Sequence, residues 1–136
     1  MTRKFQLRHI GVFLAILLVP ILALVRATEF YPWEYLASGA VLLSVLAFTF
    51  VGIDKRKATR AQWRIPENHL HLLELLGGWP GSYLAQRLYW HKVSKMSYQV
   101  TFWIIVAIFQ YVALDYLLDW RLTTFIAGFL RHEQGG

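Results

Sequence analysis

Long apolar segments alternate with short charged segments along this chain. Residues 10–25 and 35–53 carry no charge, and residues 98–118 carry a single aspartate near their end. An α-helix rises about 1.5 Å per residue, so about 20 apolar residues cross a hydrocarbon layer of roughly 30 Å. The pattern therefore predicts an all-α membrane protein with three transmembrane helices, the first of them near the lower limit of length.

The composition supports lipid as the solvent of this chain. Of its 136 residues, 57% are hydrophobic and only 16% are charged, whereas a soluble domain carries about 25% charged residues. At this length we expect one integral membrane domain over residues 1–136. Cysteine is absent, which excludes disulfides, thiolate metal sites and cysteine nucleophiles.

The first apolar segment has two interpretations. It follows Arg3, Lys4 and Arg8, as a cleavable signal peptide also would. Arg26, directly before Ala27, spoils the small-residue pattern of a cleavage site. We expect a retained membrane anchor.

The basic residues indicate the orientation. Five of them lie in the predicted loop 54–67, which the positive-inside rule places in the cytoplasm. The N-terminus, two spans away, is basic as well and falls on the same side. The connection 26–34 and the C-terminus are then outside, where the short apolar segment 122–130 is expected to form an interfacial helix.

The segment 68–91 is apolar but broken by Gly77, Gly78, Pro80 and Gly81. A full span would place the basic residues that follow it outside, against the charge rule. A re-entrant or interfacial helical hairpin starts and ends inside and agrees with that rule. We expect Gly77 and Gly78 to end the first half, Gly81 to permit the turn, and Ser82 to cap the second half.

Glu74 is the candidate for chemistry inside this hairpin, because an ionisable group at membrane depth indicates function. The alternative is a structural pair, in which His71 or Arg87 neutralises the carboxylate. Asp115 and Asp119 have helical spacing and are either an acid/base pair or a solvated helix end. The spacing of His69, His71 and His91 indicates no metal site, and no cofactor fingerprint is present, so we expect neither.

The basic loop is the candidate binding site. Asp54 lies among basic residues, which stabilise its charged form, and it can orient Lys55 or Arg64 toward an anionic group. Anionic lipid head groups are the expected ligands, at about 1 kcal/mol per surface cation. Nucleic acid is disfavoured because the loop is short and held against the membrane.

Several stretches resemble one known family: GIDKRKA, RIPE, LHLLELLGGWPGSYLAQRL, and HK followed by Lys95. It is a family of small bacterial membrane proteins of unassigned function, sometimes fused behind a cold-shock domain. These 136 residues contain no cold-shock segment, so RNA binding is not carried over. The resemblance implies a cytoplasm-side module of loop plus hairpin and no particular reaction. The matching motif positions are Asp54, Lys55, Arg64, Pro66, Glu67, Gly77, Gly78, Gly81, His91 and Lys95.

We therefore expect a bacterial inner-membrane protein that binds an anionic lipid head group or a protein partner on its cytoplasmic side, and that is not an enzyme. The predicted site comprises the motif positions other than Pro66, together with Glu74. One alternative is a membrane enzyme acting on a lipid-linked or isoprenoid phosphate, with Glu74 or His91 as acid/base. Another is a subunit of an oligomeric transporter, because three spans are few for a pathway.

Overall fold

The computed structural model describes residues 3–89, 92 and 95–136, and every regular element among them is a helix. The elements are α1 (Arg3–Ala27), α2 (Trp33–Thr59), α3 (Glu67–Leu73), the π-helical turn η1 (Glu74–Gly78), α4 (Trp79–Tyr89), α5 (Met96–Leu117) and α6 (Arg121–Gln134). The predicted all-α class is confirmed.

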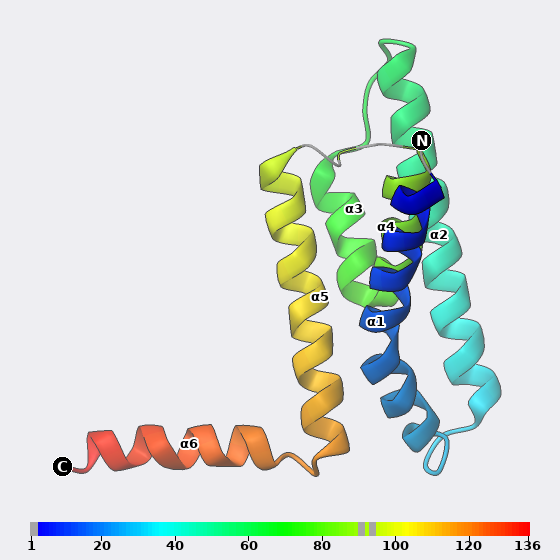
Figure 1. Ribbon diagram of the computed structural model, residues 1–136. Coiled ribbons are helices and arrows are strands. Elements are labelled where there is room, and N and C mark those ends of the chain that lie inside the picture. Colours follow the sequence, from blue (N-terminus) through cyan, green and yellow to red (C-terminus); the bar gives the residue numbers. More distant parts are fainter. Residues whose placement is uncertain (1–2, 90–91, 93–94) are drawn as a thin grey trace.

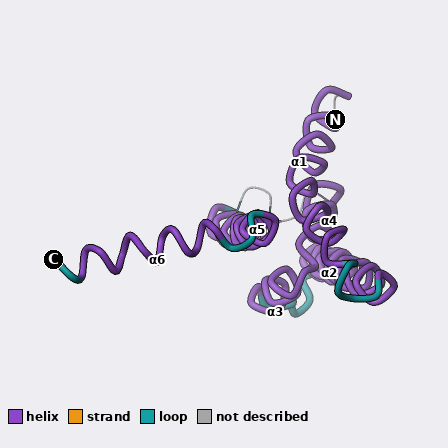
Figure 2. The backbone as a smooth tube through the Cα atoms, turned by 90° about the horizontal axis from the view of Figure 1, so that it is seen from below, coloured by secondary structure: helices purple, strands orange, loops and turns teal. Residues whose placement is uncertain are grey.

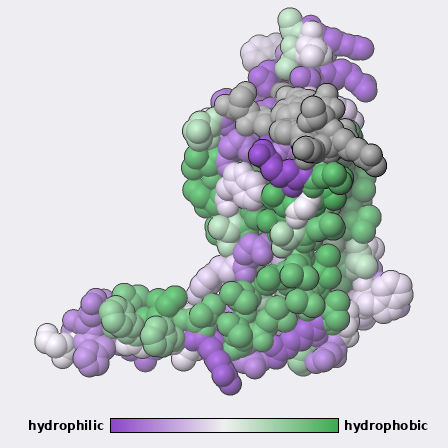
Figure 3. Space-filling model, in the orientation of Figure 1, coloured by the Kyte–Doolittle hydropathy of each residue, from purple (hydrophilic) through white to green (hydrophobic). Residues whose placement is uncertain are grey.

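Three helices are long and apolar enough to cross a membrane, over Leu7–Ala27, Trp33–Thr59 and Met96–Leu117. They run along one another (Figure 1), and large apolar side chains point outward along all three. Figure 3 shows an apolar surface over the middle of the visible face, with polar groups at both ends. Outward apolar side chains over this length are what a lipid environment requires.

α2 continues beyond the apolar segment. The predicted loop from Asp54 is helical as far as Thr59, because lysine, arginine and alanine favour helix and nothing here breaks it. The inward face of α2 carries Ala47, Val51 and Asp54, all buried. The basic residues thus stand on the last turns of a helix, which projects above its neighbours at the upper end of Figure 1.

The broken segment is a helical hairpin. α3 runs from the basic end of the bundle toward its middle, and α4 returns to the same end (Figure 1). The reversal is made at Gly77, whose φ of 125° is a conformation that side chains rarely adopt. The expected turn at Gly81 and cap by Ser82 are wrong, because α4 already begins at Trp79 and Pro80 fits its first turn.

Gly78 and Gly81 instead allow α4 to lie against the backbone of α2. A Cβ atom on Gly78 would lie 2.6 Å from the Leu43 carbonyl oxygen, and one on Gly81 would lie 1.8 Å from that of Ser44. Small residues at a helix crossing permit this approach in membrane proteins. The hairpin is therefore fixed to α2 by close backbone packing.

The core lies where the hairpin meets the three long helices. The Tyr83 ring on α4 stacks on Phe13 of α1 at 5.7 Å between centroids and lies 6.3 Å from Phe102 of α5. Tyr83 and Phe102 are fully buried. Aromatic packing of this kind fixes the hairpin between α1 and α5.

α6 turns away from the bundle at the opposite end, as Figures 1 and 2 both show. Asp115 is buried and accepts hydrogen bonds from the backbone N–H groups of Leu122 (2.9 Å) and Thr123 (3.4 Å), so it caps α6. Asp119 pairs instead with Arg26. The two aspartates therefore make separate structural contacts and do not pair with each other, and the expectation of a solvated helix end is wrong for Asp115, which is buried.

Candidate functional site

A basic pocket lies at the end of the bundle where α2 ends and the chain approaches α5. Its volume is about 300 Å³, at the small end of the range for ligand sites. Six residues line it: Lys55, Ala58, Thr59, Arg64, Lys92 and Lys95. Four of these six carry a positive charge, so the pocket is suited to an anion.

Asp54 holds the loop that forms one wall of this pocket. Its side chain is 0% exposed, and its carboxylate accepts hydrogen bonds from Arg64 Nη2 and from the backbone N–H of Ile65, both at 3.0 Å. The hydrogen bond to Asp54 raises the pKa of the Arg64 guanidinium. Asp54 therefore holds Arg64, one of the two basic residues that it was expected to orient, and is itself hidden from a ligand.

Glu67 is the second carboxylate of this region. Its Oε1 atom accepts hydrogen bonds from Lys92 Nζ at 2.7 Å and from Lys95 Nζ. These bonds lower the pKa of the Glu67 carboxyl from 4.5 to about 2. Its side chain is 29% exposed and that of Lys95 is 53% exposed, so this pair lies at the rim.

Lys92 is a site residue that the sequence analysis missed. Its side chain is only 5% exposed, and its Nζ atom lies 2.7 Å from Glu67 and 3.8 Å from Asp54. Its backbone has a φ of 61°, uncommon outside glycine and frequent at functional sites. The Nζ atom also lies 5.5 Å from the centre of the Tyr98 ring, which forms a cation–π contact. Lys92 thus links the two carboxylates with α5.

Glu74 lies deeper in the bundle and is 0% exposed. Ser82 Oγ (2.6 Å) and Tyr98 Oη (2.5 Å) donate hydrogen bonds to its Oε1 atom, and His71 Nδ1 lies 2.6 Å from its Oε2 atom. Buried carboxylates are stabilised by such multiple donors. Three helices meet at this carboxylate, because His71 belongs to α3, Ser82 to α4 and Tyr98 to α5.

A chain of hydrogen bonds leads away from Glu74. Ser82 Oγ accepts from Gln86 Nε2 at 3.0 Å, Gln86 Oε1 accepts from Gln99 Nε2 at 2.7 Å, and Gln99 Oε1 accepts from Arg87 Nη2 at 3.4 Å. Every bond points its donor toward Glu74, so the chain is polarised from a guanidinium to a carboxylate.

The structure separates the predicted site into two parts. Asp54, Lys55, Arg64, Glu67 and Lys95 come together at the basic pocket. Glu74 and the glycines do not join them. Gly77, Gly78 and Gly81 shape the hairpin tip in the middle of the bundle, where they turn the chain and contact α2. His91 lies outside the described residues.

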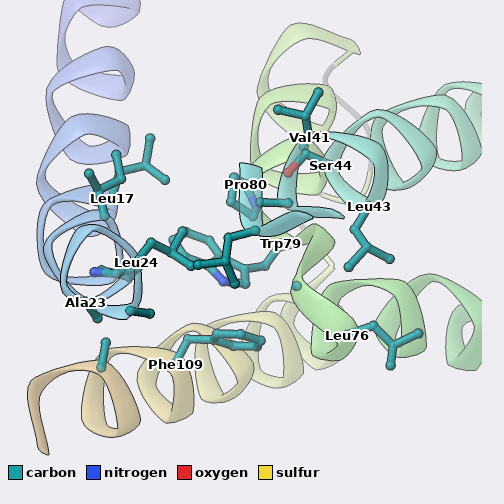
Figure 4. A pocket seen from close by; sticks show the side chains of 18 of the residues that line it. Leu17, Ala23, Leu24, Val41, Leu43, Ser44, Leu76, Trp79, Pro80 and Phe109 are labelled. Carbon is teal, nitrogen blue, oxygen red and sulfur yellow. The ribbon is translucent and has the colours of Figure 1, made fainter. Parts of the chain in front are cut away.

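A second, larger pocket lies beyond the hairpin tip, away from the basic end. It has a volume of about 860 Å³ and an almost wholly apolar lining from α1, α2, α5 and the tip. Figure 4 shows Trp79 and Pro80 at its centre, with Leu24 and Phe109 facing them from α1 and α5. The hairpin fills only the basic half of the bundle, and this pocket is the space that it leaves in the other half.

Residues 44–98 match the family described as "Protein of unknown function (DUF1294)". The chain is also 36% identical over 64 residues to the uncharacterized protein YsdA of Bacillus subtilis (strain 168), which covers 47% of this chain and 72% of that relative. The chain belongs to the DUF1294 family. No solved structure matches it.

The DUF1294 segment covers most of both polar sites. All six lining residues of the basic pocket lie within residues 44–98, as do Glu74 and its three partners. α1 and α6 lie wholly outside the matched segment. The predicted resemblance is confirmed, and the segment that defines it contains the basic pocket and the hairpin.

Proposed function

We propose that this protein binds the anionic head group of a membrane lipid in the basic pocket. The observation that carries this proposal is the convergence of Lys55, Arg64, Lys92 and Lys95 on one small cavity. In the described structure, no carboxylate pairs with Lys55, whose ammonium group is therefore available to a ligand. Lysine and arginine are the usual partners of phosphate oxygens.

The proposed placement is a bacterial inner membrane, with the N-terminus and the basic pocket in the cytoplasm. The positive-inside rule supports it, because the basic residues gather at one end of three apolar helices. In this placement the hairpin is re-entrant: both of its ends lie at the basic end, and its tip lies in the middle of the bundle. α6 then lies on the outer interface, with Phe125 and Phe129 exposed to lipid.

The test is native mass spectrometry of the protein extracted gently from its own membrane, with identification of the bound lipid. We expect a stoichiometric anionic lipid on the natural protein. Lys55→Ala should weaken its retention about fivefold, since one cation near a membrane surface contributes about 1 kcal/mol. Lys57→Ala is the matched control, because Lys57 stands on the same helix end and does not line the pocket.

Equal lipid retention by the Lys55→Ala and Lys57→Ala proteins would refute the pocket as the binding site. Insertion must be unchanged in both variants, which protease protection of the membrane-embedded protein verifies. The predicted contribution of His91 stays a prediction, and His91→Ala belongs in the same series.

A role as an accessory subunit or homo-oligomer is the second candidate, and the apolar pocket favours it. A cavity of about 860 Å³ open between membrane helices suits a partner's side chains. A stoichiometric protein partner without retained lipid would support this role. The enzyme alternative has less support, because Glu74 is sealed by its three partners and lines neither pocket.

A further inference from the structure

The two carboxylates beside the basic pocket, Asp54 and Glu67, differ in how accessible they are to a ligand. Asp54 is fully buried and bound by Arg64 and the backbone of Ile65, so a ligand cannot displace it. Glu67 lies at the rim, partly exposed, and holds Lys92 and Lys95. Glu67 binds these two lysines as an anionic ligand would, so an incoming anion must compete with Glu67 for them.

The formal charge of the pocket follows from these groups. Among the residues that the structure describes, four cations line it and two carboxylates, Asp54 and Glu67, pair with them, which leaves a formal excess of two positive charges. A phosphodiester head group carries one negative charge. A phosphate monoester carries about 1.5 to 2 at neutral pH, and Coulomb attraction grows in proportion to that charge.

We propose that the pocket selects doubly charged phosphate groups, a phosphate monoester or a diphosphate, over singly charged phosphodiesters, and that Glu67 competes with both kinds of ligand for Lys92 and Lys95. The inference rests on the proposed function of the pocket. A dianion matches the excess charge that remains with Glu67 in place, and its Coulomb attraction to the lining cations is about twice that of a monoanion. The volume of about 300 Å³ suits a head group of this size.

The experiment compares two lipids with the same acyl chains, dioleoyl phosphatidic acid and dioleoyl phosphatidylglycerol, titrated into the purified full-length protein in zwitterionic detergent. Native mass spectrometry gives the dissociation constants. We expect phosphatidic acid to bind at least tenfold more tightly. Glu67→Gln removes a negative charge beside the pocket, so it should strengthen the binding of both lipids, that of phosphatidic acid at least as much, and the preference should persist. Glu34 lies in the first turn of α2, far from the pocket, so Glu34→Gln should leave both dissociation constants unchanged.

Inorganic pyrophosphate, added as a competitor, distinguishes the source of the phosphate. If pyrophosphate at the same concentration displaces phosphatidic acid, the selected dianion is a soluble phosphate compound. If it does not, the selected dianion is a lipid head group. Equal binding of the two lipids would overturn the selectivity and leave the proposed function intact, and unchanged binding of both lipids by the Glu67→Gln protein would overturn the competition by Glu67. Binding of neither lipid, or binding unaffected by Lys55→Ala, would overturn the proposed function itself.

Discussion

Gly81→Ala tests the contact that fixes the hairpin to α2. The added Cβ atom would lie 1.8 Å from the Ser44 carbonyl oxygen and 2.6 Å from its carbonyl carbon, far inside the 3.4 Å at which ordinary contact begins. Both neighbours are backbone atoms in the middle of a long helix and cannot rotate away. Overpacking costs about 1–3 kcal/mol where side chains can adjust. We therefore expect at least about 3 kcal/mol of destabilisation, because α4 must move away from α2.

The free energy of unfolding can be measured by titrating the protein from mild detergent into sodium dodecyl sulfate and following its helical circular dichroism. Gly39→Ala and Gly128→Ala are matched controls, because a Cβ atom at either position meets nothing within 4 Å. The controls should change the free energy by no more than about 1 kcal/mol, in the stabilising direction expected for alanine in a helix. An equally small effect for Gly81→Ala would refute the described contact between α4 and α2.

Two further predictions concern the carboxylates. The pKa of Glu67 is lowered in the folded protein from 4.5 to about 2, so its stabilising effect is complete above about pH 4.5 and is lost as the pH falls through 2. Glu67→Gln should remove that part of the pH dependence of unfolding, and an unchanged profile would contradict it. Glu74→Ala leaves the buried Ser82 and Tyr98 hydroxyls and the partly exposed His71 ring without their partner and should cost about 3 kcal/mol or more. Glu74→Gln keeps one acceptor oxygen and should lower the free energy of unfolding by less than Glu74→Ala in the same titration. Equal destabilisation by the two variants would contradict the described bonds.

The architecture could be predicted from the sequence because a lipid environment imposes a simple rule. Uncharged segments of sufficient length become membrane-crossing helices, and basic residues gather at one end. The pairing of His71 with Glu74 was also predictable, since residues three apart share a helix face. Gly77 was correctly placed at the break, because glycine alone adopts its positive φ without strain.

Contacts between distant segments could not be read from these local patterns. Lys92 joins Glu67 and Asp54 through a backbone conformation that no composition signal predicts. Gly81 was assigned to a turn because its partner, the backbone of Ser44, lies on another helix. The role of Asp115 as a cap likewise depends on where α6 turns.

The helical hairpin brings together the polar side chains of the hydrogen-bonded chain that leads away from Glu74. A straight helix over residues 67–89 would carry Glu74, Gln86 and Arg87 at different depths and without shared partners, and each polar group exposed to hydrocarbon costs several kcal/mol. Reversal at Gly77 brings Ser82 of α4 to Glu74 and places Gln86 behind it as a donor to Ser82, and α5 supplies a further donor to Glu74 and the link to Arg87. The reversal also returns the chain to the basic end, where Lys92 reaches Glu67 at the start of the same hairpin. The break that interrupts the apolar segment is thus the feature that satisfies its polar residues and closes the basic pocket.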